Sequence, residues 1–586
     1  MDFNPCKPPL LGGFCFVPIT KLCHTCDEKG DPRMKSRSEA MENIKSTTFD
    51  VCVIGGGATG AGCALDAELR GLRTVLLDAA DFVSATSSAS TKLVHGGVRY
   101  LQQSVADCDL GQYRVVRRAL RERKLMLNNA PFLTRPLELL VPCFSHRDAY
   151  YFRAGLKLYD WISGQGMLSP SRFLSVHEST VRLPMLNTSG LVGTVAYTDG
   201  QFDDARYGIA LVNTFVENGG AALNYSRVAG FAKTKDGKLC EAHVEDQLSE
   251  ERFTVRAKAF VNATGPFSDQ VRSLANPGIH PRLRLSKGIH ILLPLEAAFR
   301  LDAMLIPTTD DGRVIFAIPW QGRLLVGTTD DEAALDDELA VKHEEVEYLL
   351  RHLNRYLRRP FSIDQVMSGI AGLRPLVSPG DARNTKKLIR DHEVEVNQDS
   401  GLISVLGGKW TTYRAMAEDA VNVVQQYLKS AVSPCKTQHF RLTGAEGYGP
   451  TFWHTLVPKF HISPDTAQHL SEKFGTHAVE VLELARTDRH LAASIVAGAP
   501  SIQAEIVYSI RYEMAASIED VLARRIGLQW FSWNSAIAAA PLVGSYLAQE
   551  HGWMAGQTQQ AVQEYTLKLT RTMRTAGLKP EQALAG

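Results

Sequence analysis

A short apolar run, a cluster of glycines and a helical pattern open the organised part of the chain. Residues 49–54 have the length and apolar content of a buried strand, and residues 61–70 repeat apolar positions at helical spacing. Beyond Gly71, residues 74–77 predict a second strand, which ends at Asp78. This succession predicts a βαβ unit with two parallel strands.

The pattern changes character in the last third of the chain. Apolar residues recur at helical spacing over residues 502–522 and again over 534–550, after a connection rich in Pro, Gly and Thr at residues 430–448. We therefore predict an α/β domain over residues 48–428 and an all-helical domain over residues 429–586.

Residues 1–47 lack a comparable pattern. Prolines and glycines interrupt the apolar half, and the charged half shows no strand alternation. The segment also lacks the uninterrupted apolar stretch of a secretory signal and the arginine-rich, acid-poor composition of a transit peptide. We predict an N-terminal extension that is either disordered or a targeting segment. Its Cys23 and Cys26 have C-x-x-C spacing, but no second pair of ligands follows them, so we assign no metal there.

The composition excludes several classes of protein. Of the 586 residues, 45% are hydrophobic and 22% are charged, which is typical of a globular rather than a disordered chain. A formal net charge of +1 gives no electrostatic indication of nucleic-acid binding. No apolar run approaches the roughly 18 residues of a membrane-spanning helix, so any membrane contact should be peripheral.

The glycine cluster has the G-x-G-x-x-G spacing of a dinucleotide-binding turn. Gly55 permits the tight turn, Gly57 lets the backbone approach a pyrophosphate, and Gly60 lets the helix pack against the sheet. Asp78 stands at the end of the second strand, where an acidic residue binds ribose hydroxyls. The motif by itself does not separate NAD from FAD.

Later segments narrow the choice of cofactor. Residues 86–97 bring hydroxyls, a lysine, a histidine and two adjacent glycines into one loop, which suits a flat cofactor that carries phosphates. A second glycine turn follows the strand at residues 259–263, and residues 407–414 open a helix whose N-terminus can face a flavin ring. The expected cofactor contacts are Gly55, Gly57, Gly60, Asp78, Thr86, Ser87, Ser88, Lys92, His95, Gly96, Val228, Thr264, Gly265, Gly408, Lys409 and Thr411.

The order of these motifs strongly resembles that of the FAD-dependent glycerol-3-phosphate dehydrogenases. GGGATG, TSSASTKLVHGGVRY, VNATGP, SKGIHI, VGTTD, AGLRPL and GGKWTTYR follow one another between residues 49 and 424. Segments from residue 474 onward look like the α-helical cap of the same enzymes. The resemblance implies a Rossmann-like, glycine-oxidase-like FAD-binding domain with an interleaved β-rich substrate domain, followed by a C-terminal all-α domain. It also places Asp203 and Asp204 in a structural element beneath the site, so we assign no metal to them.

The resemblance assigns binding of the substrate to Arg99, Tyr100, Arg374 and Lys409. Of these, Arg99 and Arg374 would bind its phosphate, and Lys409 would lie near flavin and substrate, where its charge can stabilise the reduced flavin. Arginine suits phosphate binding because its fork binds two phosphate oxygens, although a lone arginine is more often part of a surface ion pair. The first candidate to accept the hydroxyl proton of the substrate is His290, whose alternative role is that of a histidine buried in the core. Arg374 and Lys409 are further candidates for the same step.

The activity that the resemblance implies is oxidation of sn-glycerol 3-phosphate to dihydroxyacetone phosphate. The hydride on C2 would pass to flavin N5, and ubiquinone would take the electrons at the inner mitochondrial membrane, where the protein would bind peripherally. Residues 150–162 carry a basic amphipathic pattern that faces either the core or the bilayer. A homodimer is one candidate assembly. The alternatives are an oxidase of the same family that uses O₂, and a flavin-binding protein without turnover.

Overall fold

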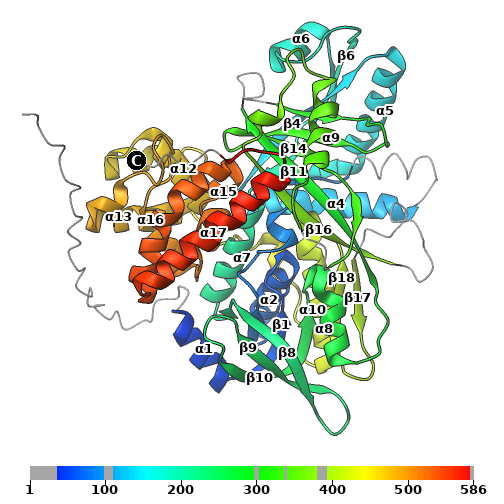
Figure 1. Ribbon diagram of the computed structural model, residues 1–586. Helices are drawn as coiled ribbons and strands as arrows, with labels where there is room; N and C mark the ends of the chain where they lie inside the picture. The colour runs from blue at the N-terminus through cyan, green and yellow to red at the C-terminus, as the bar shows by residue number, and fades with distance from the viewer. Residues whose placement is uncertain (1–35, 98–109, 296–301, 336–338, 379–391, 581–586) are drawn as a thin grey trace, which may run out of the picture.

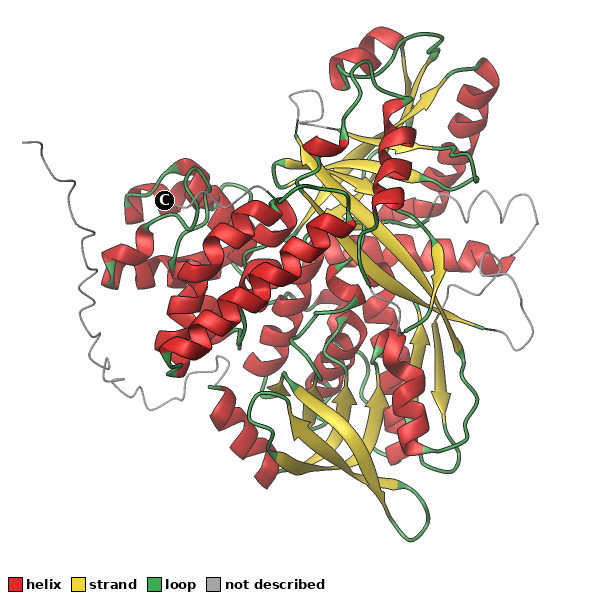
Figure 2. Cartoon of the chain, viewed as in Figure 1, coloured by secondary structure: helices red, strands yellow, loops and turns green. Residues whose placement is uncertain are grey.

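The computed structural model describes residues 36–97, 110–295, 302–335, 339–378 and 392–580. These residues form two sheet-based parts and a helical domain that lies to one side of them (Figures 1 and 2). The parts are interleaved along the chain, because the second sheet takes its strands from segments between the strands of the first.

The first sheet has eight strands and carries the predicted βαβ unit. Its strands are β1 (Thr48–Ile54), β2 (Thr74–Leu77), β7 (Ala221–Leu223), β8 (Ser226–Lys233), β9 (Leu239–Asp246), β10 (Arg252–Asn262), β17 (His392–Val396) and β18 (Ile403–Gly407). The order across it is β17-β18-β10-β1-β2-β7, and the five strands from β18 to β7 run parallel. Ile54 is in register with both Leu77 and Asn262, so β1, β2 and β10 end at one edge. Ligands of such sheets bind at this carboxyl edge.

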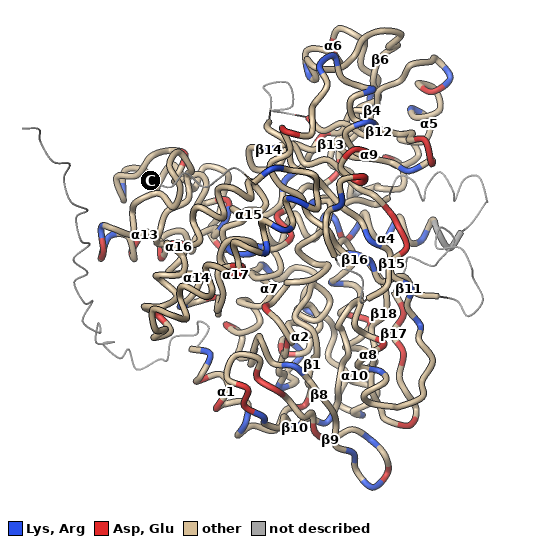
Figure 3. Tube along the Cα trace, viewed as in Figure 1, with Lys and Arg blue, Asp and Glu red and all other residues tan. Residues whose placement is uncertain are grey.

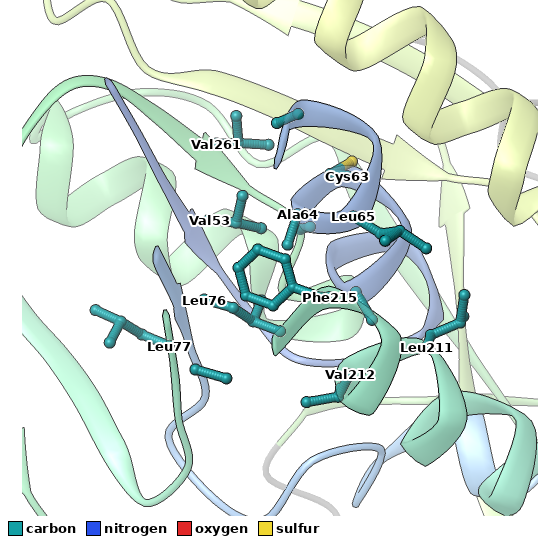
Figure 4. Close-up of a cluster of buried hydrophobic side chains, with 14 of the residues drawn as sticks. Val53, Cys63, Ala64, Leu65, Leu76, Leu77, Leu211, Val212, Phe215 and Val261 are labelled. Atoms are coloured by element: carbon teal, nitrogen blue, oxygen red, sulfur yellow. The ribbon is translucent and has the colours of Figure 1, made fainter. Parts of the chain in front are cut away.

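Helices cover both faces of this part of the chain. They are α1 (Arg37–Ser46), α2 (Ala58–Leu69), α4 (Leu110–Asn129), α7 (Asp204–Glu217), α8 (Ser268–Ala275) and α10 (Tyr413–Leu428). Figure 4 shows Phe215 of α7 among side chains of α2 and of the parallel strands, such as Ala64, Val53 and Leu76, and all four are buried. Continuous apolar strands of this kind are expected where a parallel sheet is covered on both faces.

The second sheet has ten strands and forms the part at the top of Figure 1. Its strands are β3 (Leu93–Val94), β4 (Thr134–Cys143), β5 (Arg172–Leu174), β6 (Gly193–Phe202), β11 (Leu283–Pro294), β12 (Ala303–Ile306), β13 (Ile315–Trp320), β14 (Arg323–Gly327), β15 (Asp331–Ala333) and β16 (Ser368–Val377). The helices on it are α5 (His146–Ser163), α6 (Val176–Arg182) and α9 (His343–Asn354). Strands β11 and β16 pair without a break from Leu283↔Val377 to Leu292↔Ser368.

The C-terminal part is entirely helical among its described residues. Its helices are α11 (Trp453–Phe460), α12 (Pro464–Phe474), α13 (Ala478–Thr487), α14 (Ala504–Tyr512), a π-helix (Asp520–Arg525), α15 (Leu528–Phe531), α16 (Trp533–His551) and α17 (Ala555–Thr575). The architecture therefore confirms the expected fold class, with an α/β domain, an interleaved β-rich domain and a helical domain. Helix α10 ends at Leu428, and the helical part follows it in the chain. No helix of the described residues is both long enough and apolar enough to cross a membrane.

One long helix does not form over residues 502–522, although the apolar spacing continues across them. Helix α14 ends at Tyr512, and Met514 takes a left-handed φ of 52°. The carboxylate of Asp520 accepts hydrogen bonds from the backbone N–H groups of Ala516 and Ser517, which starts a new helical segment. Local side-chain caps therefore override a continuous hydrophobic pattern.

The expectation of a disordered extension up to residue 47 is wrong for residues 37–46, which form α1. Ser36 and Glu39 cap this helix reciprocally, and Met41 and Ile44 are buried on its inner face. Arg37 also forms a bidentate ion pair with Asp246 on β9, at 2.7 and 3.0 Å. The helix carries few apolar residues, so its pattern was too weak to separate it from a charged linker.

Candidate active site

A continuous cavity of about 1700 Å³ follows the carboxyl edge of the first sheet and extends to strands β11 and β16 of the second. Most of the residues selected from the sequence line it. They are Gly55, Gly57, Asp78, Thr86, Ser87, His95, Val228, Thr264, Gly265, His290, Arg374, Gly408, Lys409 and Thr411. Segments more than 300 residues apart in the chain thus meet around one space.

The nucleotide end of the cavity is a close-fitting backbone cradle. Gly55 has a φ of 102°, and a Cβ on it would lie 2.7 Å from the carbonyl oxygen of Ala263. A Cβ on Gly57 would lie 3.0 Å from the Oγ of Ser87, which accepts a hydrogen bond from the Ala58 N–H. Helix α2 begins at this point, so the N–H groups of its first turn, other than that of Ala58, can bind a phosphate. Gly55 therefore lets the turn pack against the end of β10, and Gly57 lets it pass close to Ser87.

Asp78 adds an acidic acceptor beside this cradle. Its carboxylate accepts hydrogen bonds from the backbone N–H groups of Gly56 at 2.6 Å and Ala80 at 2.9 Å. Burial raises the pKa of Asp78 to about 7, although these two bonds act in the opposite direction. An acid in this position suits the ribose hydroxyls of a dinucleotide.

Four of the expected cofactor contacts do not line the cavity. Gly60 packs its backbone directly against that of Gly55, which is the helix-packing role anticipated for it. Ser88 donates to the Ala85 carbonyl, and the N–H of Gly96 donates to the Tyr159 hydroxyl. Lys92 is fully buried and pairs with Asp204. The loop is therefore supported on the side away from the cavity by Lys92, Ser88 and Gly96. The sequence of a hydrophilic loop does not reveal which of its side chains face the ligand.

The buried pair of Lys92 and Asp204 also accounts for the acidic dipeptide on α7. Asp204 accepts from the Ser90 N–H as well, so it fixes the loop of residues 86–97 from below. Asp203 caps α7 by accepting from the Arg206 N–H. Among the described residues, no group of His, Cys, Asp and Glu is arranged to hold a metal ion.

The segment after β18 closes the middle of the cavity. Gly407 and Gly408 both have left-handed φ values, 70° and 90°, which turn the chain sharply into a 3₁₀ turn at Trp410–Thr412. The indole N–H of Trp410 donates to the Ser87 carbonyl at 2.7 Å, and the His95 N–H donates to the Thr411 hydroxyl at 3.3 Å. Burial, followed by the charge of Lys409, lowers the pKa of His95 to about 4, so this imidazole is neutral. The two loops are thereby joined into one wall.

At the substrate end, the strand register brings His290 and Arg374 together. Gly288 on β11 faces Gly372 on β16, and alternation places Gly288 and His290 on the same face of their strand. A Cβ on Gly288 would overlap the guanidinium of Arg374, so that group lies directly over the glycine and beside the histidine. The motifs SKGIHI and AGLRPL therefore form one site. They lie on paired strands, and Gly288 has no side chain to occupy the space that the Arg374 guanidinium takes.

The His290 imidazole is buried in the cavity wall. Its Nε2 lies 3.0 Å from the hydroxyl of Thr91, and its Nδ1 has no hydrogen-bond partner among the described residues. Burial, and then the positive charges of Arg374 and Lys92, hold the pKa of His290 well below its usual range. The ring is thus neutral, and it leaves one nitrogen in the cavity wall without a protein partner, which a histidine satisfied in the core would not do.

Arg374 is held in place by residues whose role the sequence did not reveal. Its Nη2 donates to the Thr328 hydroxyl at 2.7 Å, and its Nη1 lies 3.4 Å from an Asp330 oxygen. Both belong to the VGTTD segment, and both line the cavity with Phe316 and Arg313. The segment containing Arg313 had the composition of a turn, and nothing in its spacing linked it to the site. Arg99 and Tyr100 lie outside the described residues.

Comparisons with known proteins agree with this geometry. Residues 50–414 match the family model described as FAD dependent oxidoreductase, and residues 435–558 match the C-terminal domain of alpha-glycerophosphate oxidase. The probable mitochondrial glycerol-3-phosphate dehydrogenase of Caenorhabditis elegans is 38% identical over 547 residues, which are 92% of this chain and 76% of that protein. The mitochondrial glycerol-3-phosphate dehydrogenase of Homo sapiens is 37% identical over 530 residues, 88% of this chain and 73% of the relative.

Solved structures give the same assignment. The glycerol-3-phosphate dehydrogenase from Bacillus halodurans, complexed with FAD, has a TM-score of 0.75 and 30% identity, and covers 92% of this chain and 98% of its own. The L-alpha-glycerophosphate oxidase from Mycoplasma pneumoniae, with FAD bound, shares the fold at a TM-score of 0.52, 18% identity and coverage of 68% and 99%. The cradle at Gly55 and Gly57, the acid at Asp78 and the long cavity fit FAD as the cofactor. The chain belongs to the FAD-dependent oxidoreductases, and within them to the glycerol-3-phosphate dehydrogenase family.

Proposed function

We propose that this chain oxidises sn-glycerol 3-phosphate to dihydroxyacetone phosphate with FAD and passes the electrons to ubiquinone. One observation carries the proposal: the Arg374 guanidinium lies over Gly288, beside the neutral His290, at the end of a cavity whose other end fits a dinucleotide. A cation for a phosphate next to a group that accepts a proton is what a polyol phosphate requires. The names of the relatives support the same substrate.

The roles of the side chains follow from their positions. Arg374, oriented by Thr328, binds the phosphate, and Lys409, which lines the same cavity, adds a second positive charge. Arg99 and Tyr100 stay assigned to the phosphate by resemblance alone. When bound, FAD supplies the acceptor for the C2 hydride at its flavin N5. His290 takes the hydroxyl proton, because its imidazole lines the same cavity as Arg374 and its Nδ1 has no partner among the described residues.

The surface of α5 supports docking at a membrane. Its inner face is buried through Leu156 and Tyr159, as the amphipathic pattern predicts. Its outer face, however, exposes Tyr150 to 73% and Trp161 to 71%, and nearby residues on and around the helix add further exposed apolar and basic side chains. They are Phe144, Arg147, Tyr151, Arg153, Lys157, Met167 and Phe173. Aromatic residues mixed with basic ones are typical of a protein that binds the interface of a bilayer without spanning it.

This surface favours ubiquinone over O₂ as the electron acceptor, because a quinone is dissolved in the membrane. Charges of both signs occur throughout the rest of the described chain, as Figure 3 shows. The mitochondrial relatives support a mitochondrial location, and we place the protein peripherally on the inner membrane. A homodimer stays a prediction, which light scattering after size-exclusion chromatography would test.

The test is to mix the purified holoprotein anaerobically with glycerol 3-phosphate and follow the absorbance of the flavin. We expect glycerol 3-phosphate to bleach it, and glycerol and glycine to leave it oxidised, because neither carries a phosphate for Arg374. Reoxidation by a quinone analogue that is much faster than by air identifies a dehydrogenase, and the reverse identifies the oxidase. A yellow protein that none of these compounds bleaches would be a flavin-binding protein without turnover, and would contradict the proposal.

A further inference from the structure

The helical domain forms part of the wall of the FAD cavity. Ser517, Asp520 and Arg524, near and within the π-helix, line the cavity, as does Lys568 of α17. They lie with residues 79–81, which directly follow Asp78 in the chain. In Figure 1, the helical domain stands beside α7.

A network of buried ion pairs fixes the helical domain at this position. Asp81 lies at the centre of the network. Its carboxylate forms a bidentate pair with Arg525, at 2.5 and 2.9 Å, and accepts a hydrogen bond from the Nε of Arg524 at 2.6 Å. Glu513 accepts hydrogen bonds from Nη1 and Nη2 of Arg206 on α7, both at 2.8 Å. All of these side chains are at most 6% exposed. Buried charges of this kind are tolerated only when they are paired with good geometry, so the two domains are held in one arrangement.

Arg524 links the network to the cavity itself. The Nη2 of Arg524 donates to the Asp520 carboxylate at 2.5 Å, and the hydroxyl of Tyr225 donates to the same carboxylate at 2.7 Å. Arg524, Asp520 and Tyr225 all line the cavity and come from two different domains. A π-helix is rare and is found frequently at functional sites, where it changes the direction of one side chain.

The orientation of FAD in the cavity determines which part of the cofactor reaches the wall formed by the helical domain. In a βαβ dinucleotide site, the pyrophosphate lies at the helix N-terminus and the ribose of the nucleoside lies at the acid that ends the second strand. The adenosine of FAD therefore lies beyond Asp78, where residues 79–81 and the π-helix meet. We infer that the helical domain completes the adenosine subsite of FAD, with Arg524 as the residue that connects domain docking to retention of the cofactor. This inference rests on the FAD site of the proposed function and adds a second domain to it.

The experiment is to titrate the apoprotein with FAD and with FMN, which lacks the adenosine. In Arg524→Gln we expect the FAD dissociation constant to rise by at least about tenfold, the effect of losing one hydrogen-bonded charge. The dissociation constant for FMN should equal that of the unaltered chain. Arg511→Gln is the matched control, because Arg511 pairs with Glu550 within the helical domain and does not line the cavity. The melting temperature of each apoprotein, with and without FAD, serves as a second readout.

Two results would overturn the inference. The first is an unchanged dissociation constant for FAD in Arg524→Gln. The second is an equal loss of affinity for FAD and FMN, since the contact would then not be at the adenosine. If Arg524→Gln does not fold, Tyr225→Phe decides between the same outcomes, because it removes only the hydroxyl that binds Asp520. These titrations contain no substrate. A failure of glycerol 3-phosphate to bleach the flavin would therefore contradict the proposed function and leave this inference standing.

Discussion

Asp78 and His290 are ionisable residues at opposite ends of one cavity, Asp78 partly buried and His290 fully buried, and desolvation favours the neutral form of each. For Asp78 the neutral form is the protonated acid, and for His290 it is the free base. Asp78 must therefore lose its proton to accept ribose hydroxyls, and His290 must gain one when it takes the proton of the substrate hydroxyl.

The pKa of Asp78, about 7, predicts that FAD affinity depends on pH. Below pH 7 the carboxyl is mostly protonated, and above it the ionised carboxylate accepts the ribose hydroxyls. We expect the dissociation constant for FAD to fall about tenfold between pH 6 and pH 8, since only the ionised fraction binds fully. Titration of the apoprotein by flavin fluorescence measures this change.

The variant Asp78→Asn should bind FAD more weakly and lose the pH dependence. A dependence of the same size in that variant would assign it to another group. The sign for stability is opposite: an acid whose pKa is raised in the folded state stabilises the apoprotein at low pH. That contribution disappears as the pH rises from about 4 through 7.

His290→Asn is expected to slow the reduction of the flavin by at least about a hundredfold, the usual effect of removing a general base. Binding of FAD should be unchanged, because the described residues that cradle the pyrophosphate lie at the other end of the cavity. Anaerobic stopped-flow spectroscopy at saturating substrate measures the rate. A rate within a few-fold of that of the unaltered chain would transfer the role to Lys409 or Arg374.

At the scale of elements, the site depends on two strands that approach closely. Gly288 and Gly372 face each other in the register of β11 and β16, and Gly372 also packs against Ala89 of the cofactor loop. Thr86 of the same loop donates to the Leu373 carbonyl at 2.6 Å. The strand that carries Arg374 is thereby tied to the loop that holds the cofactor.

Gly288→Ala is expected to displace the Arg374 guanidinium, because the new methyl group would occupy its position. The KM for glycerol 3-phosphate should rise by about tenfold or more, the effect of losing a charge-assisted bond to phosphate. Flavin content should not change. Gly556→Ala is the matched control, because its Cβ would meet nothing within 4 Å on α17. A KM for Gly288→Ala equal to that of the control would show that Arg374 does not bind the phosphate.

At the scale of the whole molecule, α5 and the helical domain lie apart, at the upper right and at the left of Figure 1. The first is available to a membrane, and the second closes the nucleotide end of the cavity. The surface proposed to meet the membrane and the domain proposed to retain FAD are therefore separate parts of the molecule.

Replacing Tyr150 and Trp161 together with serine should weaken binding to anionic lipid vesicles by at least about tenfold, because each aromatic ring contributes burial at the interface. Flavin reduction by glycerol 3-phosphate in detergent should be retained. The double variant Val432→Ser/Met554→Ser is the control, since it removes two equally exposed apolar side chains elsewhere. Vesicle co-sedimentation is the measurement, and equal binding by the two double variants would contradict membrane docking through α5.

Much of this protein was predictable from the sequence, because its elements have strong local patterns. The βαβ unit formed with strands at 48–54 and 74–77, almost as predicted, since apolar runs and glycine turns are properties of short segments. The order of motifs was also sufficient to identify the family and its cofactor. Helix α1 and the interruption after Tyr512 were missed, because capping and ion pairs to distant residues decided them.

The tertiary structure alone decided which face of each segment meets the ligand. In the loop of residues 86–97, Ser87 and His95 line the cavity, whereas Lys92 turns inward to Asp204, a partner 112 residues away. The same holds for Arg524, which the sequence presents only as a charged residue of a helical domain. Local sequence determines the type of an element, but the pairing of buried charges depends on residues that only folding brings together.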